Sequence, residues 1–186
     1  MGGHALHPLR RFASYRRRSG HATRCLVVLL AGVPSKGLWT MQTVSMRRSV
    51  AAPIDEVFDW IGDGTNWASV PGMFYSRVQP TDGPEPNGVG SIREFASVTS
   101  KATEVVTGFE RPRYMSYKVL SSTPRLEHDG GSITFKEIPV GTEVFWTTTF
   151  RVTTPVLAGL LTRLYARLLP MGMEGVTRTA ERALTR

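Results

Sequence analysis

The stretch MRRSVAAPIDEVFDWIGDGTNWASVPG, residues 46–72, decides the fold. It begins inside a strand that we predict over residues 44–51. Pro53 then suits the first position of a helix, and the acidic residues of the next turn face the positive end of the helix dipole. One apolar face recurs at helical spacing over Ile54, Val57, Phe58 and Ile61. Two glycines end this helix, and residues 66–70 predict a second short helical turn.

The sequence after residue 72 changes to strand-like segments and ends in one long helical segment. Residues typical of strands, separated by Gly- and Pro-rich turns, predict strands over residues 73–79, 91–98, 102–108, 114–121, 126–138 and 143–152. One antiparallel sheet with a single long helix is an α+β arrangement. A twisted sheet that curls around a helix leaves a space between them, and the short helices after the first strand would close one end of it. Function would then depend on the side chains that line this space.

The final helix is predicted to begin at Pro155, with Thr154 as its cap. Leucines at helical spacing predict its buried stripe, which comprises Leu157, Leu160, Leu161, Leu164 and Leu168. Pro170 lacks the N–H that would bond the carbonyl of Ala166. We therefore expect the helix to be kinked or interrupted there.

Seven of the eight net positive charges come from the first forty residues. Residues 1–40 contain seven basic and no acidic residues, whereas residues 41–186 contain 16 Lys and Arg against 15 Asp and Glu. A near-neutral domain gives little support to a surface that follows nucleic-acid phosphates. We therefore predict a single domain over residues 41–186, a separate basic tail over residues 1–40, and no nucleic-acid partner.

Three interpretations of the basic tail remain open. The nine-residue apolar run over residues 25–33 is too short to span a bilayer but suits the core of a signal peptide. The tail could equally be a disordered extension, with translation starting at Met41 or Met46 rather than Met1, or a functional basic arm. We predict a disordered or signal-like tail, no stable membrane span, and a cytoplasmic protein, with export as the alternative if the tail is a signal.

Cysteine and histidine are concentrated in the tail as well. Cys25 is the only cysteine, and three of the four histidines lie in residues 1–40, which leaves His128 alone in the domain. One histidine and no cysteine nearly exclude a zinc site of the usual kind and exclude a cysteine nucleophile. We predict no metal and no cofactor.

His128 stands next to Asp129, which invites comparison with a Ser-His-Asp triad. The pair precedes Gly130 and Gly131, which predict a turn or bulge, and the sequence contains no G-x-S-x-G nucleophile elbow. We therefore predict that His128 lies in an exposed loop and takes no part in a triad.

Several short motifs occur in an order that resembles one known superfamily. They are SVAAP at residues 49–53 followed by Val57-Phe58 and Trp67, VGSIR at 89–93, FERPRY at 109–114, GTEV at 141–144, and the terminal amphipathic helix. Together they resemble the polyketide cyclase/dehydrase-like branch of the START/Bet v 1 (SRPBCC) superfamily over residues 44–186. The resemblance implies a helix-grip fold: a curved antiparallel sheet of about seven strands around a long C-terminal helix, with two short helices after strand 1 and a deep hydrophobic cavity. It implies little about reaction, because ligand binders, lipid carriers, aromatase/cyclases and hormone receptors all belong to the superfamily.

Strand alternation selects the side chains that would line such a cavity. The candidate ligand-binding residues are Arg93, Glu104, Tyr117, Trp146, Met115 and Phe95. If the hairpin turns at residues 99–101, Arg93 and Glu104 come opposite or diagonal on one face, within reach of each other. Plant hormone receptors of this superfamily look similar here, because they carry G-S-x-R-E and then a T-E strand whose Arg and Glu meet in the ligand site. The alternatives remain that both charges are exposed on their strands, and that Tyr117 and Trp146 are ordinary core residues.

Three functions remain open for the domain. The first, which we favour because the domain has so few histidines and cysteines, is binding or carriage of a small hydrophobic ligand, lipid-like or polyketide-like, in an internal cavity. The second is a polyketide cyclase/dehydratase-type enzyme in which Arg93, Glu104 or Tyr117 polarises a carbonyl or moves a proton. The third is a toxin-like or regulatory interaction protein.

Overall fold

The computed structural model describes residues 40–186, so the predictions for residues 1–39 fall outside the described part of the chain. The elements are β1 (Gln42–Val50), α1 (Ile54–Gly62), the 3₁₀ helix η1 (Gly64–Ser69), β2 (Met73–Gln79), β3 (Ile92–Ser97), β4 (Lys101–Glu110), β5 (Tyr114–Thr123), β6 (Leu126–Ile138), β7 (Gly141–Val152) and α2 (Ala158–Leu184). Every predicted strand and helix is present, with ends shifted by a few residues.

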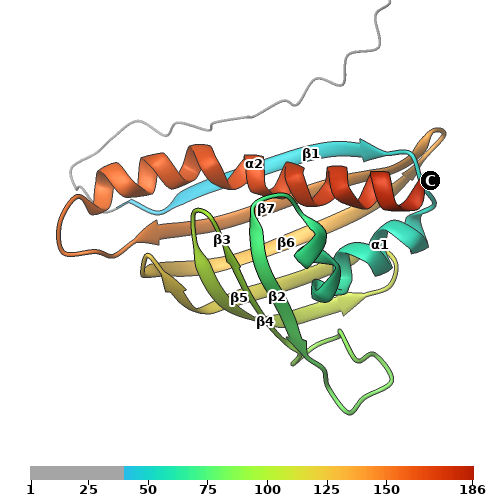
Figure 1. The fold of residues 1–186 in the computed structure, drawn as a ribbon, viewed down its shortest axis with the longest axis horizontal. Helices are drawn as coiled ribbons and strands as arrows, with labels where there is room; N and C mark the ends of the chain where they lie inside the picture. The colour runs from blue at the N-terminus through green and yellow to red at the C-terminus, as the bar shows by residue number, and fades with distance from the viewer. Residues whose placement is uncertain (1–39) are drawn as a thin grey trace, which may run out of the picture.

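The strands form one antiparallel sheet in the order β1-β7-β6-β5-β4-β3-β2. Strands β2 to β7 are joined to their neighbours in chain order, whereas β1 pairs with β7 at the far edge. Figure 1 shows the sheet curving beneath α2, which lies along β1 and β7. This arrangement confirms the predicted α+β fold, a curved seven-stranded sheet with a long C-terminal helix and two short helices after the first strand.

Helix α1 and η1 pack against one end of the sheet. The apolar face predicted for α1 is buried, and the Phe58 ring meets the edges of Phe109 and Phe135 with centroids 4.9 and 5.1 Å apart. Trp67 of η1 is also buried, and its indole N–H donates to the carbonyl of Ile61 at 3.0 Å. The two short helices are therefore joined to each other as well as to the sheet.

Strand β7 shows how the sheet turns one face toward α2. Its even-numbered residues from Thr142 to Val152 are buried, and the odd-numbered residues between them are half-buried. This period of two places every second side chain in the core between the sheet and α2. The face predicted from Val144, Trp146, Thr148, Phe150 and Val152 is thus the inward face.

The buried leucine face predicted for α2 is wrong for three of its five residues. Leu157, Leu160 and Leu164 are exposed, whereas Leu161 and Leu168 are half-buried. The residues buried beneath the helix are Ala158, Thr162, Tyr165, Ala166, Pro170, Met173, Val176, Thr177 and Ala180. Alanine and threonine make up five of these nine residues, since α2 lies close to β1 and β7. The Thr162 hydroxyl accepts the Val152 N–H at 3.0 Å.

The predicted start of the helix is also wrong, because α2 begins after Leu157 and not at Pro155. Leu157 has φ 61°, in the left-handed region, and the Thr154 hydroxyl donates to the Val156 carbonyl instead of capping the helix. Pro170 does not interrupt α2, which continues through it to Leu184. The turns on both sides of Pro170 are packed on the sheet, and this packing offsets the missing hydrogen bond.

Candidate functional site

The candidate site is built around an ion pair on the β3–β4 hairpin. Arg93 and Glu104 are direct partners in the strand register, and Arg93 Nη2 lies 2.7 Å from Glu104 Oε1. Both side chains are almost fully buried, at 1% and 3% exposed. The pairing follows the prediction, and the alternative of two exposed strand charges is wrong. The turn at residues 97–101 fixes the register, because the Ser97 N–H donates to the Ser100 carbonyl at 2.7 Å.

Aromatic rings from two other elements flank the guanidinium group. Its central carbon lies 4.9 Å from the ring centroid of Trp67 in η1 and 5.6 Å from that of Tyr117 in β5. Trp146 of β7 donates its indole N–H to the Tyr117 hydroxyl at 2.9 Å. Ring faces attract a cation, so these contacts compensate part of the cost of removing the charge from water.

Gly64 and Gly131 make room for two of these side chains. A β-carbon at Gly64 would lie 2.9 Å from Arg93 Cδ, and one at Gly131 would lie 2.2 Å from Tyr117 Cζ. Both distances are too short for a real contact. Glycine at these positions therefore allows Arg93 to approach η1 and the Tyr117 ring to lie across β6.

Most hydrogen-bonding capacity of Arg93 is unused by the described residues. Within residues 40–186, Nε and Nη1 have no acceptor, and the Nη2 contact with Glu104 lacks the alignment of a hydrogen bond. The hydroxyl of Ser91, two residues away on the chain, is also buried without a partner among those residues. Buried donors are nearly always satisfied in folded proteins, so this group of donors marks a place where a further oxygen acceptor would be stabilised.

Burial dominates the electrostatics of the site. Loss of solvent raises the pKa of the Glu104 carboxyl, and the neighbouring Arg93 charge lowers it in part. Burial, followed by the charge of Glu104, raises the pKa of Tyr117 to about 12, so the phenol stays protonated at neutral pH. The site thus holds a permanent cation beside two groups that are pushed toward their proton-bearing forms.

His128 belongs to this cluster, and the prediction of an exposed loop is wrong. It lies inside β6 at 6% exposed, and its ring stacks on Tyr117 with centroids 5.5 Å apart. Nδ1 accepts the Val119 N–H at 3.0 Å, so Nε2 carries the proton and donates to the Thr148 hydroxyl at 2.8 Å. Burial lowers the pKa of His128 to about 4, which makes the ring neutral at physiological pH.

The sequence did contain a signal for the burial of His128. Leu126 and His128 are two residues apart, so both lie on the inward face if the strand continues through them. The glycines that follow it form a bulge, one of the two predicted conformations, since the β6–β7 register shifts between His128 and Gly130. The strand continues through that bulge, however, and this continuation carries His128 into the core.

The remaining predicted residues differ in how close they lie to the ion pair. Phe95 packs its ring against Trp67, with centroids 5.5 Å apart. Met115 is fully buried but lies beside Gly62 of α1, at the end of the sheet that α1 and η1 cover. Their burial fits either a ligand-lining or an ordinary core role, and the predicted ligand contacts stay predictions.

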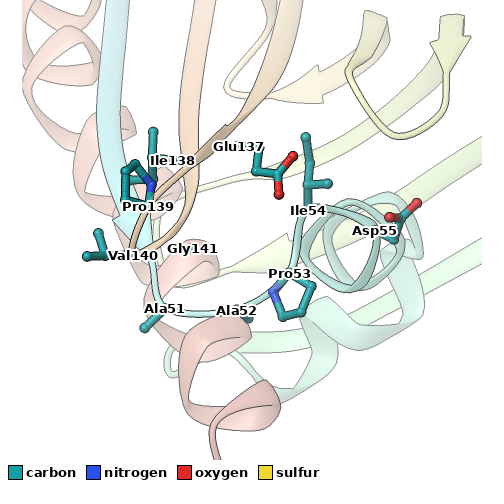
Figure 2. Close-up of a pocket in the computed structure, with 10 residues that line it drawn as sticks. All are labelled: Ala51, Ala52, Pro53, Ile54, Asp55, Glu137, Ile138, Pro139, Val140 and Gly141. Carbon is teal, nitrogen blue, oxygen red and sulfur yellow. The ribbon is translucent and has the colours of Figure 1, made fainter.

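The ion pair does not open into either of two surface pockets. One pocket, of about 490 Å³, lies where the chain passes from β1 into α1 beside the β6–β7 turn, as Figure 2 shows. Asp55 and Glu137 are its only charged lining residues. The second, of about 310 Å³, lies over Gly130 and Gly131. Tyr117 lines this second pocket, whereas neither Arg93 nor Glu104 does.

The described part of the chain contains neither a cluster of metal ligands nor a membrane-spanning helix. Among residues 40–186, no three metal-binding side chains lie close enough together to hold an ion. No helix there is long and apolar enough to cross a membrane.

The sheet wrapped around α2, with a buried ion pair in its interior, defines a helix-grip protein. A family model described as "Polyketide cyclase / dehydrase and lipid transport" matches residues 41–184. The chain belongs to this family, and the family supports a role in hydrophobic-ligand binding or cyclisation. No curated protein matches the chain.

Solved structures share the fold at low sequence identity. TTHA0849 from Thermus thermophilus is 18% identical with a TM-score of 0.64, covering 77% of this chain and 97% of that one. The Zhui aromatase/cyclase from Streptomyces sp. R1128 is 18% identical with a TM-score of 0.62, covering 77% and 95%. Ara h 8.0201 is 13% identical with a TM-score of 0.59, covering 78% and 99%. At these identities the likeness extends to the fold alone.

Proposed function

We propose that this protein binds a small, largely hydrophobic ligand with an oxygen acceptor at one end, and that Arg93 donates hydrogen bonds to that oxygen. The observation that carries the proposal is the set of unused donors on a nearly fully buried guanidinium. An oxygen atom placed there would accept charge-assisted hydrogen bonds from the guanidinium. These bonds would replace the ones that Arg93 makes to water in the unfolded chain. The apolar remainder of the ligand would lie among the rings and aliphatic side chains beneath α2.

The ion pair favours a polar group of limited charge. Glu104 already neutralises Arg93 at 2.7 Å, so a carbonyl, a hydroxyl or a shared carboxylate suits the site better than a phosphate. The aromatic rings of Trp67 and Tyr117 flank the guanidinium and confine the acceptor to its edge. The ligand class is therefore lipid-like or polyketide-like, with one polar end.

A second candidate is a cyclase or dehydratase acting on a polyketide-like chain. The observation that favours it is that the protonated Tyr117 phenol lies beside the Arg93 guanidinium, so it can donate a proton or a hydrogen bond to a carbonyl held by Arg93. A carrier protein releases its ligand unchanged. A cyclase or dehydratase would release a product whose covalent structure differs from that of the bound polyketide.

Native mass spectrometry of the full chain, followed by titration with palmitate and with hexadecane, tests the binding proposal. We expect palmitate to quench or shift the fluorescence of Trp67 and Trp146, and hexadecane to bind at least ten-fold more weakly. The variant Arg93→Met/Glu104→Leu, which removes both charges together, should abolish that preference. Arg47→Met is the matched control, because Arg47 pairs with Glu143 while 58% exposed. The proposal fails if the double variant keeps the preference, or if no member of a lipid and polyketide panel binds.

A further inference from the structure

We infer that the end of the molecule where α2 begins docks on the surface of an anionic lipid bilayer. The first observation is a row of exposed apolar side chains, the leucine stripe, which comprises Leu157, Leu160, Leu164 and Met171 at 62%, 60%, 46% and 66% exposed. Spacings of four and seven residues place Leu160, Leu164 and Met171 on one side of α2. Leu157 directly precedes the first residue of the helix. Single exposed leucines are ordinary on a surface, but a continuous row marks a contact surface.

The charges beside the first turns of the stripe are positive. From Pro155 to Met173 the sequence contains Arg163 and Arg167 and no acidic residue. Glu174, one turn beyond Met171, pairs with Arg48 and Arg178. Arg163 and Arg167 are exposed and follow Leu160 and Leu164 by three residues, so each flanks the stripe. Neither of these two forms an ion pair within residues 40–186.

Two turns of the sheet lie beside the start of α2. The Tyr165 hydroxyl donates to the Thr99 carbonyl, which holds the β3–β4 turn, with Val98 71% exposed, against α2. The Thr153 N–H donates to the Arg125 carbonyl at 2.9 Å, which places the β5–β6 turn beside the loop that leads into α2. Figure 1 shows that loop at the free end of α2, away from α1.

The charges decide which occupant the stripe fits. A second copy of the chain meeting it through a two-fold axis would bring Arg163 and Arg167 of both copies together. The tail over residues 1–40 contains seven basic and no acidic residues, so it would repel Arg163 and Arg167 and does not suit the stripe either. An anionic bilayer accepts the leucines among its acyl chains and the arginines at its headgroups, as interfacial amphipathic helices do.

The basic tail joins the domain on the same side. Gln42 at the start of β1 pairs with Phe150 near the end of β7, and β7 leads directly into α2. A bilayer under α2 would therefore lie close to the point where seven more basic residues are attached. The inference goes beyond ligand binding and does not depend on it, since the stripe and the Arg93 donors are separate observations.

Co-sedimentation of the full chain with vesicles tests the inference. We expect binding to phosphatidylcholine vesicles that contain phosphatidylglycerol and little binding to phosphatidylcholine alone. Leu160→Ser/Leu164→Ser should weaken vesicle binding about ten-fold or more. Arg163→Gln/Arg167→Gln should weaken it about five-fold per arginine, because each cation near an anionic surface contributes about that factor.

Val140→Ser is the matched control, because Val140 is 71% exposed on the β6–β7 turn far from the stripe. Circular dichroism at each step verifies that the variants are folded. Equal binding by wild type and both α2 variants would assign membrane affinity to the basic tail and overturn the inference. A wild-type dimer that the leucine variant converts to a monomer, with vesicle binding unchanged, would assign the stripe to a second copy and overturn it as well.

Discussion

His128 should make the stability of this protein depend on pH between 4 and 7. The folded protein holds the ring neutral, with a pKa of about 4, whereas the unfolded chain protonates it at about the ordinary value of 6.5. Between these values the unfolded state binds more protons, so stability falls as pH falls. One pKa unit corresponds to about 1.36 kcal/mol, which gives a full effect of about 3.4 kcal/mol. About 2 kcal/mol of it should be lost by pH 5.

The comparison that isolates this effect is wild type against His128→Gln. Glutamine retains a hydrogen-bond acceptor and a donor but does not titrate. The substitution therefore weakens the hydrogen bonds equally at every pH. It also removes the loss of stability that protonation of His128 causes at low pH. Urea unfolding at pH 7 and pH 5, followed by tryptophan fluorescence, measures both free energies of unfolding. We expect wild type to be the more stable at pH 7, with its advantage reduced by about 2 kcal/mol at pH 5.

Other titrating groups cancel in this comparison because both proteins contain them. They include Glu104, whose raised pKa acts in the opposite direction and adds relative stability as pH falls. Histidine titration by NMR supplies an independent measurement on the folded protein. A His128 pKa near 6.5, or an advantage over the variant that does not change with pH, would refute the assignment of a buried neutral ring.

Three further predictions concern the packing of the site and its surface controls. Glu104→Gln should destabilise the fold by about 3–5 kcal/mol because it leaves Arg93 buried without a counter-charge, whereas Arg93→Met/Glu104→Leu should cost much less or even stabilise it; denaturant unfolding of both compares them. Gly131→Ala should cost about 1–3 kcal/mol, because its methyl group would overlap the Tyr117 ring, and near-ultraviolet circular dichroism should record the displaced tyrosine. Arg47→Ala should change the free energy of unfolding by at most about 1 kcal/mol, since its ion pair with Glu143 is exposed to solvent.

The order of elements was predictable because each has a local signal. Pro53, the apolar spacing of α1 and the alternation of β7 depend on residues close together in sequence, and the structure places these elements where the sequence does. The Arg93–Glu104 pair was predictable for the same reason, because a short hairpin turn fixes the register between its strands.

Features that depend on distant contacts were not predictable in this way. The buried face of α2 is selected by how closely the helix approaches β1 and β7, so Ala158 and Thr162 lie inside while Leu160 and Leu164 lie outside. Hydrophobicity alone would predict that the two leucines are buried and that Ala158 and Thr162 are exposed. His128 is buried because a bulged strand continues past two glycines, and only the alternation of Leu126 and His128 favours that over a turn.

The ion pair and the leucine stripe are connected through one hairpin. Arg93 and Glu104 lie on β3 and β4, and the turn that joins these strands is held to α2 by the hydrogen bond from Tyr165 to the Thr99 carbonyl. Tyr165 lies one residue after Leu164, on the adjacent side of the same helix turn. A force that moves the first turns of α2 therefore acts on the hairpin that carries the buried cation. We therefore expect ligand entry or exit at Arg93 to be coupled to movement of this hairpin or of α2, and the surface proposed to meet the bilayer lies at that junction.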